Sequence, residues 1–163
     1  MKMIALIILA TIICSSCTKT EKDRSKSNVQ NTLFYLNSED TIALHADQYG
    51  MKQYVMAFIK TGDNDSLSRD EIIQLQSDHL KNITILAEQK KLLLAGPFIQ
   101  SDSLRGVFIF DLNDKEEALR LCNTDPAINK GLFKIELHDW YASSALFYLN
   151  DIHKKIQKKN ITE

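Results

Sequence analysis

Two side chains in the sequence, His79 and Asp125, have the chemistry of an acid/base pair. Histidine titrates near neutral pH, and a carboxylate bonded to one ring nitrogen can fix the tautomer and support proton transfer. His79 falls inside the apolar stripe of a predicted helix, and Asp125 directly precedes Pro126. By themselves these positions favour structural roles: a core histidine bonded to a backbone carbonyl, and an aspartate that ends a helix.

The other reactive residue types have weaker or structural interpretations. Gly96-Pro97 is either a turn that lines a pocket or simply a turn. Cys122 lies in a helical pattern and is expected to be a small buried hydrophobe rather than a nucleophile. His138 and Asp139 are neighbours in a predicted strand, so their side chains point to opposite faces and cannot easily act together. The sequence contains no HExxH, GxxxxGK or GxSxG motif, and we expect no metal and no cofactor.

A helix and a strand must position His79. Ser68 followed by Glu71 is a capping-box pattern that begins the helix. The 3.6-residue period that follows places His79 on the apolar side. The helix leads into a short apolar strand, Leu92 to Ala95, which we expect to end in a turn at Gly96-Pro97.

The predicted elements follow the order strand, helix, strand, strand, helix, strand, with an extra C-terminal helix. The strands span residues 53–60, 92–95, 105–112 and 131–141, and the C-terminal helix spans residues 143–159. This order predicts an α+β, ferredoxin-like βαββαβ fold with both helices on one face of an antiparallel sheet. Because the strands are apolar on both faces, the second face also needs a cover. Sheet-to-sheet dimerisation is the simplest cover, and the C-terminal helix is the second candidate.

Length and charge limit the class of protein. The 163 residues allow one domain with appendages. A formal net charge of −1 argues against a nucleic-acid partner. Four lysines near the C-terminus could contact anionic lipid head groups, although a solvated helix end is the favoured interpretation: Lys154, Lys155, Lys158 and Lys159.

The N-terminus resembles a bacterial lipoprotein signal. Lys2 supplies the positive charge, and Ile4 to Ile13 form an apolar segment too short to span a bilayer. Ser15-Ser16 supply small residues before Cys17, which implies removal of residues 1–16 and lipidation of Cys17. Cys14 departs from the pattern, because an aliphatic residue is usual there, and an ordinary secreted protein cut nearby is the alternative. Residues 17–50 are then a polar tether and an N-terminal extension.

An ordered set of motifs resembles the YCII-related (YciI-like) family over about residues 53–141. The set comprises His79, Gly96-Pro97, Asp125-Pro126 and Trp140, and the flanking segments look like a lipoprotein or secreted branch. The resemblance implies a dimeric α/β barrel built from residues 51–142. Residues 143–163 then form the C-terminal amphipathic helix that the pattern of apolar residues predicts. It also implies a shared site at His79 and Asp125, with Gly96 and Pro97 at the substrate.

We therefore expect a homodimeric protein of the bacterial cell envelope, held to the lipid bilayer through Cys17. It would bind a small polar or aromatic molecule between helix and sheet, with His79 as the acid/base and Asp125 orienting it. The alternative is a non-catalytic binding or assembly module of the envelope, with a structural dimer and His79 in the core. The sequence leaves open whether the protein is an enzyme, and it names neither substrate nor membrane.

Overall fold

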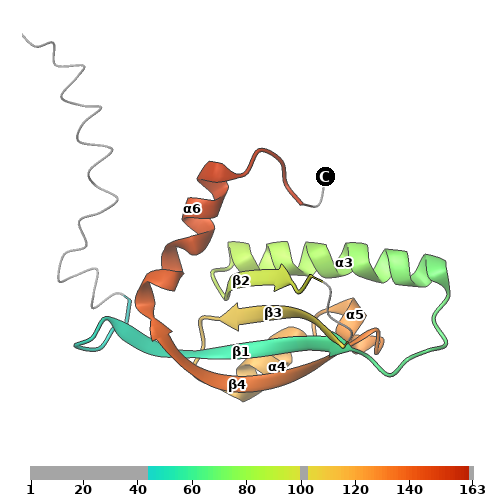
Figure 1. The fold of residues 1–163 in the computed structure, drawn as a ribbon, viewed down its shortest axis with the longest axis horizontal. Helices are drawn as coiled ribbons and strands as arrows, with labels where there is room; N and C mark the ends of the chain where they lie inside the picture. The colour runs from blue at the N-terminus through green and yellow to red at the C-terminus, as the bar shows by residue number, and fades with distance from the viewer. Residues whose placement is uncertain (1–43, 100–102, 162–163) are drawn as a thin grey trace, which may run out of the picture. The chain divides into compact units, whose positions relative to one another are not determined.

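The computed structural model describes residues 44–99 and 103–161, which all belong to one unit, Ser38–Glu163 (Figure 1). Its centre is a four-stranded antiparallel sheet with the strand order β2-β3-β1-β4. The strands are β1 (Met51–Thr61), β2 (Leu92–Pro97), β3 (Leu104–Phe110) and β4 (Phe133–Ser143). The helical elements are α3 (Arg69–Glu88), α4 (Lys115–Cys122), α5 (Pro126–Asn129), the 3-10 helix η1 (Ser144–Tyr148) and α6 (Leu149–Ile156).

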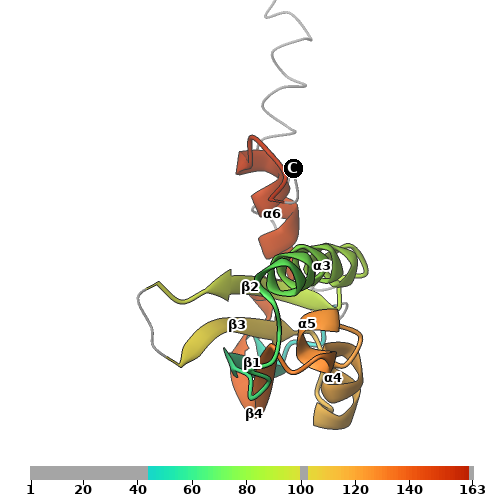
Figure 2. The same cartoon turned by 90° about the vertical axis from the view of Figure 1, so that its right-hand side faces the viewer.

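The topology confirms the predicted α+β, ferredoxin-like fold with an additional C-terminal helix. Helix α3 connects β1 to β2, and the α4–α5 segment connects β3 to β4. Strand β3 lies between β1 and β2, so each crossover skips one strand, as the βαββαβ plan requires. Figure 2 shows α3, α4 and α5 on the same side of the sheet.

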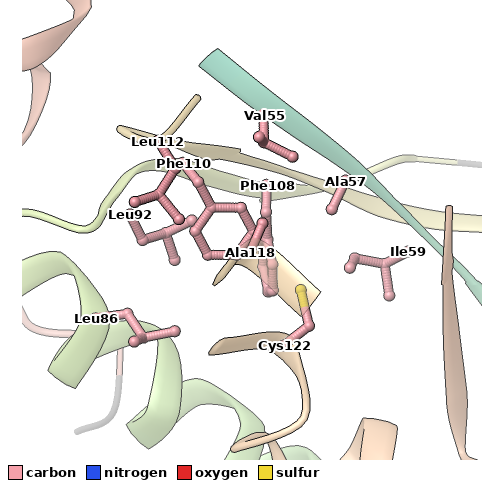
Figure 3. Close-up of a cluster of buried hydrophobic side chains, with 10 residues drawn as sticks. All are labelled: Val55, Ala57, Ile59, Leu86, Leu92, Phe108, Phe110, Leu112, Ala118 and Cys122. Carbon is pink, nitrogen blue, oxygen red and sulfur yellow. The ribbon is translucent and has the colours of Figure 1, made fainter. Parts of the chain in front are cut away.

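The main core lies between the sheet and these helices. Alternating residues of β1 and β3 point toward the helices, and Ala57 pairs directly with Phe108 in the register of the two strands. Leu86 of α3 and Cys122 of α4 close the cluster from the helix side (Figure 3). Burial of these apolar side chains fixes both helices against one face.

The opposite face carries a smaller apolar cluster. Tyr54, fully buried, packs there with Leu93 and Ile109. Leu146 and Phe147 of the C-terminal segment cover this end of the face. The predicted continuous helix over residues 143–159 is wrong in part: the covering residues lie in η1 and only Leu149–Ile156 is α-helical. Helix α6 itself has no fully buried residue, and its first turn contacts the edge strand β2.

The predicted turn at Gly96-Pro97 is also wrong. Both residues belong to β2, where Gly96 pairs with Val107 and Pro97 with Gly106. Strand β2 lies at the edge of the sheet, and proline is tolerated at edge positions because no second neighbour needs its missing N–H. The chain therefore leaves the strand after Pro97.

The predicted N-terminal features lie outside the described residues. These are the signal peptide over residues 1–16, the lipidation site Cys17 and most of the tether. No helix in the described part of the chain is long and apolar enough to cross a membrane.

Candidate functional site

Helix α3 carries His79 on its inward face. The predicted capping box is present: the N–H of Glu71 donates to Ser68 Oγ at 3.3 Å, and the N–H of Ser68 donates to Glu71 Oε2 at 2.8 Å. Two otherwise unpaired donors are thereby satisfied, which fixes where the helix begins. His79 lies mid-helix with its side chain 15% exposed, as the apolar stripe predicts.

Asp125 is placed by a second cap. Its side chain accepts from the N–H of Ala127 at 2.9 Å and so begins α5, with Pro126 in the first turn. Proline suits this position because its fixed φ is already helical and no N–H is needed there. The predicted helix-ending role of Asp125 is therefore wrong: α4 ends at Cys122, and Asp125 begins α5. The same carboxylate is fully buried and faces α3.

The structure brings His79 and Asp125 together. His79 Nδ1 lies 2.6 Å from Asp125 Oδ2, which is hydrogen-bond distance. An ionised carboxylate only accepts, so Nδ1 carries the proton of this bond and a neutral ring keeps its lone pair on Nε2. Among the described residues, no hydrogen-bond partner is found for Nε2 of His79. Every fully buried side-chain nitrogen or oxygen in these residues does have a hydrogen-bond partner, so Nε2 cannot be fully buried. Nε2 therefore meets solvent.

Two further polar residues hold the pair and were not identified from the sequence. Asn82 Nδ2 lies 3.4 Å from Asp125 Oδ2, at the long end of a hydrogen bond. Thr124 Oγ1 lies 3.1 Å from Asn82 Oδ1 and 2.7 Å from the backbone oxygen of Leu121, and its single proton is shared between these two acceptors. The available signals were weak: Asn82 follows His79 by three positions on the same helix face, and Thr124 is the residue before Asp125.

Aromatic rings from the sheet enclose the imidazole. The centroid of the Phe108 ring lies 5.7 Å from that of His79 with an interplanar angle of 20°, and the Phe133 ring lies at 5.1 Å with an angle of 60°. Phe108 comes from β3 and Phe133 from the first residue of β4. The imidazole is therefore fixed on one side by a carboxylate and on others by apolar rings.

The structure does not join Gly96 and Pro97 to this network. They lie on the edge strand, and no hydrogen bond described for His79 or Asp125 involves either of them. A Cβ atom added at Gly96 would meet no heavy atom within 4 Å. Gly96 thus borders open space.

Two hollows of about 380 Å³ each lie elsewhere on the surface, and neither is lined by His79 or Asp125. One lies between the start of α3 and the turn before β4, with Leu75, Gln74 and Lys130 in its wall. Leu75 is one helical turn before His79, so this hollow is the nearer along α3. The second lies beside the Lys52–Asp111 ion pair.

Cys122 is buried in the core and is not arranged as a nucleophile. Cys122 is 1% exposed, and its burial, with a smaller contribution from the Asp125 charge, raises the pKa of its thiol to about 12. A thiol with so high a pKa is a poor nucleophile at neutral pH. No group of three or more histidine, cysteine or acidic side chains is arranged to hold a metal ion in the described part of the chain.

Fold and site together define a ferredoxin-like α+β domain with a histidine–aspartate pair between helix and sheet. The YCII-related domain matches residues 54–140, which is just over half of the 163 residues, and the chain belongs to this family. A similar solved structure is the 5-chloro-2-hydroxyhydroquinone dehydrochlorinase from Burkholderia phenoliruptrix AC1100 in complex with 2,5-dihydroxybenzoquinone. It is 20% identical with a TM-score of 0.40, over 52% of this chain and 92% of that chain. None of the curated proteins compared with the chain matches it.

Proposed function

We propose that the protein is a membrane-anchored YCII-related enzyme that binds a small polar or aromatic molecule at His79. The structural observation that carries this function is the 2.6 Å contact between His79 Nδ1 and the buried carboxylate of Asp125. A ring held in this way presents Nε2 as a proton acceptor in a fixed direction. Membership of the YCII-related family supports the same assignment.

In the proposed reaction His79 takes a proton from the bound molecule at Nε2. The resulting imidazolium is stabilised by the Asp125 carboxylate across the Nδ1 hydrogen bond, and the proton returns to the product or to water. Phe108 and Phe133 make the surroundings of the ring apolar, which suits a flat, weakly polar substrate. Gly96 and Pro97 would border the bound molecule from the edge strand.

The experiment is a screen of small polar and aromatic compounds by NMR, with turnover assayed for each compound that binds. His79→Gln should abolish turnover or binding and leave the fold intact. His138→Gln is the matched control, because His138 is also a histidine but is exposed on β4 and paired with Glu136. A folded His79→Gln protein with unchanged binding and turnover would contradict the proposal.

A second candidate function is a non-catalytic binding or assembly module, and the burial of His79 favours it. The His79 side chain is 15% exposed and packs against Phe108 and Phe133, so its ring would then serve the core. In this function the protein pairs with a second copy through the sheet face that carries Phe58, which is only half-buried. Phe58→Asp should convert the dimer to a monomer in sedimentation measurements, and a wild-type protein that is already monomeric would refute the pairing.

We also propose that Cys17 is lipidated after removal of residues 1–16, which would place the protein in the bacterial cell envelope. The support is the sequence pattern around Cys17. Mass spectrometry of the mature N-terminus tests it. An unmodified Cys17, or cleavage at another position, would contradict the anchor while leaving the His79 site untouched.

A further inference from the structure

The apolar stripe of α6 begins on the domain and continues into solvent. Leu149 is half-buried, whereas Ile152 is 48% exposed and Ile156 is 71% exposed. At 100° per residue these three side chains fall on one side of the helix. Only the first turn of the stripe is therefore used for packing within the described part of the chain.

The first turn of α6 is bonded to the rest of the domain, and these bonds fix the direction in which the helix projects. Asn150 Nδ2 donates to the backbone oxygen of Leu92 at 2.8 Å. Asp151 lies 3.9 Å from Lys90 Nζ, and the same ammonium lies 4.8 Å from the Phe147 ring centroid. In both Figure 1 and Figure 2, α6 rises beyond α3, away from the sheet. The exposed isoleucines are therefore presented on a projecting element.

The same segment carries concentrated positive charge. Residues 152–161 include four lysines and no acidic residue: Lys154, Lys155, Lys158 and Lys159. On the helical wheel Lys155 and His153 lie on the two sides of the isoleucine stripe. Most lysines elsewhere in the described part of the domain face carboxylates, as Lys91 faces Glu117 at 3.1 Å, whereas these four have no ion pair with the described residues.

We propose that the segment Leu149–Ile161 binds the surface of an anionic lipid bilayer, with Ile152 and Ile156 entering the head-group region. An apolar stripe with basic residues on its flanks is the pattern of helices that lie in a membrane interface. The lysine ammonium groups would remain among the lipid head groups while their methylene chains extend the apolar surface. An acidic protein surface would account for the lysines but not for the exposed Ile152 and Ile156.

Binding to vesicles tests the proposal on the full chain carrying Cys17→Ser, so that no lipid can be attached. Vesicles of phosphatidylcholine are compared with vesicles that also contain phosphatidylglycerol, in a flotation assay. The N-terminal apolar segment is the same in every variant, so only differences between variants are interpreted. Lys154→Gln with Lys155→Gln should weaken binding to anionic vesicles about tenfold or more, and added salt should weaken wild-type binding.

Ile152→Ser with Ile156→Ser should weaken binding by a comparable factor. Each double variant has a matched control elsewhere on the surface: Lys81→Gln with Lys130→Gln for charge, and Ile73→Ser with Ile85→Ser for exposed apolar area. The controls should bind as the wild type does.

Three results would overturn the proposal. One is vesicle binding unchanged by both α6 double variants. The second is an equal loss of binding in the matched controls, which would mean that total charge or total apolar area matters rather than α6. The third is loss of self-association, without vesicles, when Ile152 and Ile156 are replaced, because α6 would then be a contact between copies of the chain.

Discussion

Replacing Asp125 by asparagine should invert the tautomer of His79. An ionised Asp125 carboxylate only accepts, so in the wild type we expect the proton on Nδ1, which lies 2.6 Å from Asp125 Oδ2, and Nε2 as the acceptor. An asparagine at the same position can keep the bond from the Ala127 N–H through its oxygen. Its amide nitrogen then faces Nδ1 as a donor, which leaves the ring proton on Nε2. The variant would thus lose the proton acceptor that the proposed function needs.

The size of the stability change follows from the bonds at this carboxylate. A hydrogen bond to a charged group contributes about 1.5–3 kcal/mol and a neutral one about 0.5–1.5 kcal/mol, so Asp125→Asn should cost about 1–2 kcal/mol. The neighbouring Asn82 amide must also rotate, since its nitrogen now faces another donor. Asp125→Ala also removes the α5 cap, which is worth about 1 kcal/mol, and should cost about 3–4 kcal/mol.

The assay combines urea unfolding with long-range proton–nitrogen NMR of the histidine rings at about pH 8, above the ordinary histidine pKa. The His79 signals are assigned by their absence in His79→Gln. Wild-type His79 should show a protonated Nδ1, and Asp125→Asn should show a protonated Nε2. Asp139→Asn is the matched control: its carboxylate is half-exposed beside Lys115, and surface ion pairs contribute little.

Two results would refute this reasoning. If wild-type His79 is already protonated on Nε2 alone, the Asp125 carboxylate does not set the tautomer. If Asp125→Asn folds and the His79 spectrum is unchanged, the contact between Asp125 and Nδ1 does not determine which ring nitrogen carries the proton. Where a turnover assay exists, loss of a general base should lower the rate by about 100-fold or more, and an unaffected rate would remove His79 from the chemistry.

Three further predictions concern stability and reactivity. Gly62→Ala should lower the free energy of unfolding by about 1–3 kcal/mol in urea unfolding, because the added Cβ would lie 1.9 Å from a backbone oxygen. Gly96→Ala is the control: its Cβ would meet open space, so its free energy of unfolding should be close to that of the wild type. Cys122 should resist iodoacetamide at about pH 8 in the folded protein and react in denaturant, since burial raises the pKa of its thiol to about 12; labelling at equal rates would contradict its burial. The hydrogen bond from Ser68 lowers the pKa of Glu71 below its ordinary 4.5. Glu71→Gln should therefore be less stable than the wild type above that value, and the difference should vanish as pH falls through the lowered pKa.

Local patterns in the sequence determined the kinds of elements and their order. The capping box at Ser68 and Glu71 marked the start of α3, because both of its hydrogen bonds connect residues three positions apart. The helical period placed His79 on the inward face, because the side of a helix on which a residue lies follows from its spacing along the chain and does not depend on what the helix packs against. The doubly apolar strand β1 correctly indicated that both faces of the sheet are covered at least in part.

Features that depend on contacts between distant segments could not be predicted with the same success. Gly96-Pro97 looked like a turn, but pairing with β3 extends β2 through both residues. The C-terminal segment has a helical pattern throughout, yet packing of Leu146 and Phe147 against the sheet accompanies a 3-10 start. In each case the conformation depends on which part of the sheet the segment contacts: the neighbouring strand β3 for Gly96-Pro97, and the sheet face for Leu146 and Phe147. Local sequence propensity does not contain that information.

The candidate site shows the same division. The sequence by itself supplied His79 and Asp125 as residue types with suitable chemistry, one on an inward helix face and one at a helix boundary. Only the tertiary structure decided that they meet, because they are 46 positions apart and the packing of α5 beside α3 sets the 2.6 Å between them. It also added Asn82 and the two phenylalanines, whose roles arise from what surrounds the imidazole and not from any spacing along the chain.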